Sequence, residues 1–308
     1  MVRFSNKKDI HDTPAQIAIL TTILYSDIFS FPLTRDELWD FLISERKISR
    51  GEFMNSLQTI QKEIVEKDGF YCLKSREAII KKRKENFWEV DAKMKRARFV
   101  AGKLAPIPSI LFIGISGGLA SGNASAKDDI DLIIITKKNM LFVGRFLIIL
   151  LLQLLGARRF RNQKNTADTI CVNLLFDETA LDFFADKQDI YTAREIAQII
   201  PLFERESTYQ RFIHANEWIH KFLPNVGSQK THYVKEDKEI FLSVLCRIMC
   251  NSFFEIILRV LQMTWMNRHR TRETVKNHVL AFHPKDYRVK TNKQLRLKMQ
   301  QLGLLTKF

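Results

Sequence analysis

The sequence predicts an α/β (α+β) protein in which a small mixed-sheet core lies between two mainly helical regions. Three observations predict this. Helix-capping signals and helical spacing of apolar residues mark the first 75 residues, two isoleucine-rich runs near the middle have the character of buried strands, and helical spacing returns from residue 204 to 263. We expect units over residues 1–75, 106–200 and 201–308, and a basic connecting helix over 76–105.

Composition and charge limit the class of protein. The 308 residues are 46% hydrophobic and 27% charged, which excludes a disordered chain. Lys+Arg number 49 and Asp+Glu 34, a net charge of +15 that favours polyanionic partners: nucleotide phosphates, nucleic acid or an anionic membrane face. The four cysteines are too few and scattered for a disulfide scaffold, and the polar start contains no apolar signal core. We therefore expect a cytoplasmic protein.

Three helices and a hairpin are predicted in the first unit. Thr13-Pro14 has the character of an N-cap followed by proline at the first helical position, and Thr34 with Glu37 and Ser49 with Glu52 form capping boxes. Lys67-Asp68-Gly69 is a turn signal before the short strand 70–73. Three short helices followed by a hairpin is the order of a winged helix-turn-helix.

The third helix of this unit is the one that enters the major groove in DNA-binding winged helices. It would offer Arg50, Asn55, Gln58, Gln61 and Lys62. Glu52, Glu63 and Glu66 weaken its attraction for phosphate, and the alternative is a unit that only packs against its neighbour or a protein partner. The basic helix that follows is expected to end at Pro106 and Pro108.

The segment 110–136 carries the chemistry. Two predicted strands flank Ser116-Gly117-Gly118 and a small-residue stretch long enough for about two helical turns. Asp129 and Asp131 are one residue apart at the start of the second strand, so both carboxylates point to the same face. Such a pair favours a cation between its members, and Mg²⁺ or Mn²⁺ suits the oxygen ligands. Backbone N–H groups at the glycines could approach a phosphate.

This arrangement resembles the motif of the DNA polymerase β-type nucleotidyltransferase superfamily, in which a Gly-Gly or Gly-Ser pair precedes Asp-x-Asp on the next strand. Ten residues, 119–128, separate Gly118 from Asp129. Together with residues 24–34, 171–173 and 191–195, the motif resembles an uncharacterised prokaryotic nucleotidyltransferase-like family with a winged-helix-like N-terminus and a helical C-terminus. The resemblance implies transfer of a nucleoside monophosphate from a nucleoside triphosphate to a hydroxyl acceptor, with release of pyrophosphate. Asp129 and Asp131 would hold the metal, and Ser116, Gly117 and Gly118 the phosphates.

Active members of the superfamily add a third carboxylate from a later strand, and here the central polar residue of the expected strand 169–176 is Asn173. An amide offers a neutral oxygen and takes no proton. We place Asn173 where the acceptor is activated; Asp168 or Asp177 could substitute only in another register. The alternative function is a catalytically degenerate fold that binds nucleotide or nucleic acid.

Four further segments have two interpretations each. Residues 140–156 are apolar, but Arg145 and Gln153 and the short length disfavour a membrane span. The basic loop with Arg158, Arg159, Arg161 and Lys164 could attract phosphates or be a solvated turn, and Glu195 is either an acid favoured at a helix start or a catalytic group. The basic tail, 267–298, could hold RNA or another polyanion, or be a non-specific charged surface.

Overall fold

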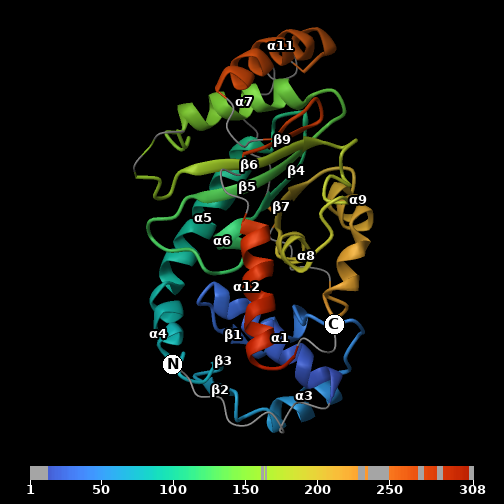
Figure 1. Cartoon of the computed structure of the whole chain (residues 1–308). Coiled ribbons are helices and arrows are strands. Elements are labelled where there is room, and N and C mark those ends of the chain that lie inside the picture. Colours follow the sequence, from blue (N-terminus) through green and yellow to red (C-terminus); the bar gives the residue numbers. More distant parts are fainter. Residues whose placement is uncertain are drawn as a thin grey trace.

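The computed structural model describes residues 13–160, 163, 165–227, 233–234, 250–269, 274–282 and 287–304. It is a mixed α and β protein, elongated, with the N-terminal unit at one end, a twisted sheet in the middle and helix α11 at the other end (Figure 1). Cys246, Arg161 and Lys164, which the sequence analysis considered, lie outside the described residues.

The N-terminal unit has the predicted helices and hairpin, but the third helix ends at Thr59, so Gln61 and Lys62 lie in the turn beyond it and the prediction that this helix presents them is wrong. All three predicted caps are present, because the side chains of Thr13, Thr34 and Ser49 each accept from a backbone N–H three residues on. Its three-stranded antiparallel sheet has the order β1-β3-β2. The elements are α1 (Pro14–Ile28), β1 (Leu33–Thr34), α2 (Arg35–Asp40), α3 (Arg50–Thr59), β2 (Ile64–Lys67) and β3 (Phe70–Leu73). Their assignment to a winged helix stays a prediction.

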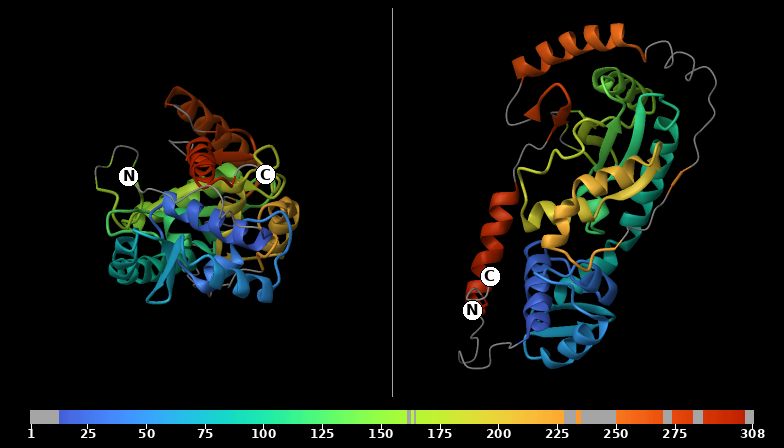
Figure 2. Two further views of the ribbon diagram at one scale, coloured as in Figure 1. Left: turned by 60° about the horizontal axis from the view of Figure 1, so that its bottom comes forward. Right: turned by 90° about the vertical axis from the view of Figure 1, so that its right-hand side faces the viewer.

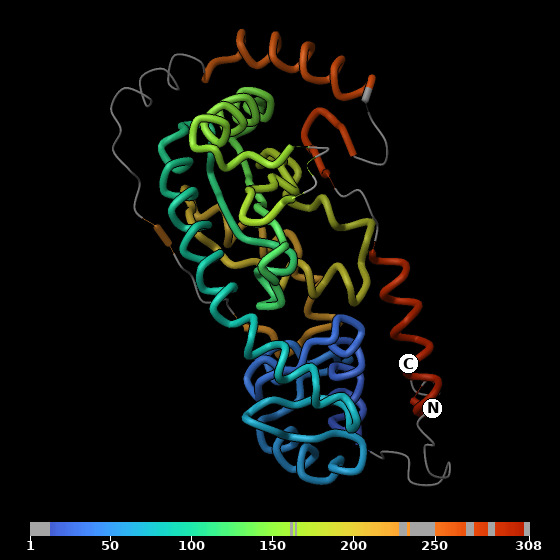
Figure 3. The backbone as a smooth tube through the Cα atoms, turned by 90° about the vertical axis from the view of Figure 1, so that its left-hand side faces the viewer, coloured from blue at the N-terminus to red at the C-terminus, as the bar shows by residue number. Residues whose placement is uncertain are grey.

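The connecting region is divided. The expected single helix over 76–105 is two helices, α4 (Ala78–Glu85) and α5 (Phe87–Leu104), which meet at Asn86. The prediction of one continuous helix is wrong at this residue, since asparagine is a weak helix former and ends α4. Helix α5 runs from the N-terminal unit along the flank of the core (Figure 3) and ends before Pro106, as predicted.

The central sheet has six strands in the order β7-β4-β5-β6-β9-β8. β5 is antiparallel to β4 and parallel to β6, and the remaining neighbours are antiparallel. The strands are β4 (Ile110–Ile115), β5 (Ile130–Thr136), β6 (Ile170–Asp177), β7 (Ile200–Glu204), β8 (Thr274–Val275) and β9 (Val279–Ala281). The last two lie in the region beyond residue 200 that we predicted to be helical, and this prediction is wrong in part, because the region also completes the sheet.

Helices cover both faces of the sheet (Figure 2). Against one face pack α5, α7 (Leu141–Leu154) and α11 (Ser252–His269). Against the other pack α8 (Ile190–Ala197), α9 (Thr208–Ala215), η1 (Glu217–Lys221) and α12 (Tyr287–Gln301). Buried residues of the N-terminal unit belong to the same apolar cluster as this second face. The N-terminal unit and the sheet therefore share one hydrophobic core.

The apolar run 140–156 corresponds to α7, whose fourteen residues lie between the sheet and α11. Within the described part of the chain, every helix is too short or too polar to cross a bilayer.

Candidate metal centre

Two carboxylates and a thiol meet where β5 and β6 begin. Asp131 is paired with Cys171 across the parallel strands. The ligand atoms of Asp129, Asp131 and Cys171 all lie within 4.8 Å of one another, and all three side chains are partly buried. Asp131 shares strand parity with Ile133 and Ile135, so the cluster lies on the sheet face that the N-terminal unit and α8 cover. The prediction that Asp129 and Asp131 lie together holds in this geometry.

The carboxyl of Asp131 is held in an unfavourable environment. Burial raises its pKa to about 7, and the neighbouring charge of Asp129 adds to the rise. The Arg159 guanidinium and a hydrogen bond from the Cys171 thiol act in the opposite direction. Glu195, on α8, also raises the pKa of Asp131, so a third acid bears on the pair. A bound cation would relieve this repulsion.

Gly117 is required by its contact with this carboxylate. Its φ is +63°, a left-handed conformation that glycine adopts without strain. A Cβ at this position would lie 2.6 Å from Oδ2 of Asp131. At Gly118 the nearest atom to such a Cβ is 4.0 Å away. The backbone at Gly117 therefore lies close to the carboxylate of Asp131, a candidate metal ligand, whereas position 118 has room for a side chain.

Ser116 links the glycine turn to the carboxylates. Its backbone N–H donates to the carbonyl oxygen of Asp131 over 3.0 Å. Its buried Oγ has no hydrogen-bond partner among the described residues, and it begins the turn that carries the two glycines. The following helix, α6 (Gly117–Ala120), is one turn long and not the two that the sequence suggested.

Arg159 is the member of the basic loop that reaches the cluster. Its guanidinium forms an ion pair with the Asp129 carboxylate. Arg158 instead lies over the ring of Phe160, at 5.0 Å from its centroid. The loop is thus more than a solvated turn, because one of its arginines contacts a predicted metal ligand.

The two alternative aspartates, Asp168 before β6 and Asp177 at its end, have other partners. Asp168 accepts from Lys93 of α5 over 2.6 Å, and the same buried ammonium donates to the Asp128 carbonyl over 2.7 Å. Asp177 is at the opposite end of β6, where it pairs with His278. Lys93 therefore fixes the loops on both sides of the cluster, and neither aspartate joins it.

Asn173 lies two residues beyond Cys171, at a β-bulge. Leu132 pairs with Val172 and Ile133 with Leu174, which leaves Asn173 as the extra residue. Before the bulge, Asp131 lies opposite Cys171. Beyond it, the pairing of β6 with β5 is shifted by one residue. In the sequence, Cys171 stands out only through the family resemblance. Its place beside the carboxylates depends on the register of two strands that are distant in sequence.

The N-terminal unit packs against the cluster's end of the sheet. The Asn123 side chain donates to the Phe29 carbonyl over 3.1 Å. Arg194 of α8 is buried against the rings of Phe41 and Tyr25, at 4.0 and 5.6 Å from their centroids. Burial lowers the pKa of Arg194 to about 10. The segment 191–195 is therefore an interface between the two units, next to the metal ligands.

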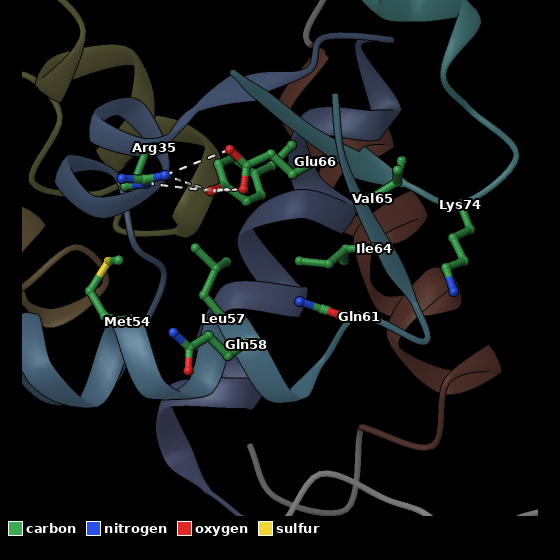
Figure 4. A pocket seen from close by; sticks show the side chains of 10 residues that line it. Arg35, Met54, Leu57, Gln58, Gln61, Ile64, Val65, Glu66 and Lys74 are labelled. Carbon is green, nitrogen blue, oxygen red and sulfur yellow. Dashed lines mark hydrogen bonds and ion pairs between the residues drawn. The ribbon is translucent and has the colours of Figure 1, made fainter. Parts of the chain in front are cut away.

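A hollow lies within the N-terminal unit, between α3 and the β2–β3 hairpin (Figure 4). Its volume is about 430 Å³ and its lining includes Gln58 and Gln61, two of the predicted groove-reading residues. Arg35 and Glu66 on its wall lie 3.6 Å apart as an ion pair, so the wall carries both signs of charge. Arg50 is paired with Asp36 over 3.0 Å. DNA binding by this unit stays a prediction.

Part of the basic tail is used inside the fold. Lys298 of α12 donates to buried Asp27 of α1 over 2.7 Å, and Arg288 pairs with Asp189 over 3.1 Å. The two cations join the tail to the N-terminal unit and to the segment before α8. They are not part of a free polyanion surface.

Neither the family models, the curated proteins nor the solved structures contain a significant match to this chain. The resemblance to nucleotidyltransferases therefore stays a prediction.

Proposed function

We propose that this protein is a metal-dependent nucleotidyltransferase that moves a nucleoside monophosphate from a nucleoside triphosphate to a hydroxyl acceptor and releases pyrophosphate. One observation carries the proposal: the carboxylates of Asp129 and Asp131 converge beside a glycine turn that comes within van der Waals range of Asp131. Paired carboxylates next to an open backbone turn suit a metal-bound triphosphate.

The donor set fits a divalent cation. Two carboxylates within 4.8 Å of each other provide hard oxygen ligands for Mg²⁺ or Mn²⁺. The Cys171 sulfur is a softer ligand, so we expect Mn²⁺ to bind better than Mg²⁺. A divalent ion held there neutralises the carboxylates and polarises a phosphate oxygen.

The chain's own residues have distinct roles in this proposal. The backbone of Ser116, Gly117 and Gly118 would hold the β- and γ-phosphates, and Arg159 would exchange Asp129 for a phosphate oxygen. The acceptor hydroxyl must lose a proton as it attacks the α-phosphorus. Asn173 takes no proton, but burial raises the pKa of Glu195 to about 7, so Glu195 can accept one near neutral pH.

Calorimetric titration of the four nucleoside triphosphates, with Mg²⁺, with Mn²⁺ and without metal, tests the proposal. We expect metal-dependent binding that Asp129→Asn or Asp131→Asn abolishes. Asp186→Asn removes an exposed carboxylate elsewhere and is the matched control. Unchanged nucleotide binding in both variants, with intact folding, would contradict the metal assignment.

A specific observation favours a second function, a nucleotide- or nucleic-acid-binding module without turnover. Among the described residues, the group that can hold a metal contains two carboxylates and Cys171 in place of a third. Arg159, moreover, already neutralises Asp129. A site of this kind can bind a nucleotide and lack the second metal position of an active enzyme.

Restoring a carboxylate distinguishes the two functions. Cys171→Asp puts an acid opposite Asp131. Asn173→Asp puts one at the bulge, at the position where the sequence predicted the third carboxylate of an active enzyme. A weakened enzyme should release pyrophosphate faster in one of these variants. Tight nucleotide binding without pyrophosphate release in the wild type and both variants would support the binding module.

A further inference from the structure

Helix α11 has an apolar face that points away from the rest of the molecule. Its side chains are between 39% and 67% exposed and recur at spacings of three and four residues, which aligns them on one side of the helix. We call this set the α11 outer face: Phe253, Ile256, Ile257, Val260 and Leu261. Such contiguous apolar exposure marks an interaction surface.

The opposite face of α11 is anchored to the core. Glu255, 1% exposed, accepts from the backbone N–H groups of Phe142 and Val143 at the start of α7, over 3.0 and 2.8 Å. Gln262 donates to the Phe142 carbonyl over 2.8 Å, and Met266 is buried. These contacts set the rotation of the helix about its axis. The outer face is consequently held outward by the fold.

The position of α11 suits a broad flat partner. It is the outermost element at the end of the molecule away from the N-terminal unit, and it lies across α7 (Figures 1 and 2). Its 18 residues give a surface about 27 Å long. Among the described residues, no other element lies outside α11 at this end, so such a helix can lie flat on a bilayer.

Charge identifies the partner. The only acid of α11 is Glu255, which is buried against α7, whereas Arg268 is exposed. The sequence that follows adds Arg270, Arg272 and Lys276 against one Glu273. A second copy of this chain would carry the same net charge of +15, which opposes pairing. An anionic lipid surface offers both an apolar layer and the complementary charge.

We propose that α11 is an in-plane amphipathic anchor that binds peripherally to anionic membranes through its outer face. The apolar side chains enter the boundary between headgroups and acyl chains, and the basic residues contact the lipid phosphates and carboxylates. The proposal is independent of the metal centre, which lies at the other end of the core.

Co-sedimentation of the full chain with lipid vesicles tests it. We expect binding to vesicles of phosphatidylcholine mixed with phosphatidylserine, weaker binding to phosphatidylcholine alone, and release by added salt. The double variant Ile256→Ser/Val260→Ser should bind about tenfold more weakly or worse. Phe87→Ser/Trp88→Ser, which removes equally exposed side chains at the start of α5, should bind as the wild type does.

Hydrogen exchange on the wild type covers the case in which the α11 variant fails to fold. Protection of residues 252–269 on addition of anionic vesicles would support the proposal. No sedimentation with anionic vesicles at low salt, or no protection of α11, would overturn it. Light scattering that shows a wild-type dimer and an α11-variant monomer would overturn it too, since a second copy would then cover the face.

Discussion

The pairing of β5 with β6 has a carboxylate at each end, Asp131 on β5 and Asp177 on β6, and the two are in opposite environments. At the far end Asp177 is fully buried and accepts from the Thr179 backbone over 3.0 Å and from His278 over 2.8 Å. At the near end Asp131 faces another carboxylate, and a thiol is its hydrogen-bond donor. The first aspartate is satisfied by the fold, and the second is not.

The difference between the two environments indicates which carboxylate serves stability and which serves ligand binding. A carboxylate whose acceptors are all met stabilises the native state. One that is buried beside a like charge costs stability, and proteins retain such groups where a ligand compensates for the cost. We therefore expect Asp177 to be a structural residue and Asp131 to be a binding residue, although both are aspartates on the same pair of strands.

The largest expected effect on stability is at Asp177, the carboxylate whose hydrogen-bond donors the fold supplies. Asp177→Ala removes a buried carboxylate together with the hydrogen bonds it accepts from the backbone and hydroxyl of Thr179 and from the half-exposed His278 ring, and should lower the free energy of unfolding by about 3 kcal/mol. Chemical denaturation measures this. A loss below that of an average surface substitution would mean that Asp177 does not hold this end of the sheet.

Gly117→Ala is expected to rank next. Adding a Cβ strains the left-handed backbone and forces it against Asp131, which should cost about 2 kcal/mol and also weaken nucleotide binding. Gly118→Ala is the matched control, because its Cβ would have space. Equal melting temperatures for the two variants would show that the close approach at Gly117 does not constrain the turn.

The protein should gain stability when the charge of Asp131 is removed. The folded-state pKa of Asp131, about 7, is above the unfolded value near 4, so burying the charged form opposes folding fully above pH 7 and not at all below pH 4. Asp131→Asn should therefore stabilise the protein by about 1–2 kcal/mol at pH 8. The gain should fade as the pH falls toward 4. Thermal unfolding across this range measures it, and a gain that grows at low pH would contradict the environment assigned to Asp131.

The smallest effect on stability is expected at Arg159. Its ion pair with Asp129 is partly exposed, so Arg159→Gln should change the free energy of unfolding by less than about 1 kcal/mol. The same change frees Asp129 for a cation, and Mn²⁺ should bind a few times more tightly while the nucleoside triphosphate binds less tightly. Titration of the metal alone and then of the nucleotide separates the two effects. A parallel loss of both affinities would contradict the competition between arginine and metal.

Sequence reasoning was most successful where the determining contacts are short in range. The capping boxes at Thr34 and Ser49, the turn at Gly69 and the pairing of Asp129 with Asp131 on one face all follow from residues within a few positions of one another. The surroundings of Asn173, in contrast, depend on the pairing of distant strands. Strict alternation along β6 would place this residue with Cys171, but the bulge after Val172 interrupts it, and nothing local marks a bulge.

The sequence by itself determined most of the elements before residue 200 and the chemical character of the site, because helix caps, strand alternation and a glycine turn depend on neighbouring residues. Only the tertiary structure decided that Cys171 lies opposite Asp131, that Arg159 contacts Asp129 and that strands beyond residue 200 complete the sheet. It also decided that α11 presents an apolar face outward, because Glu255 and Gln262 bind to α7. These outcomes depend on register and packing between segments far apart in the chain, which no short-range pattern encodes.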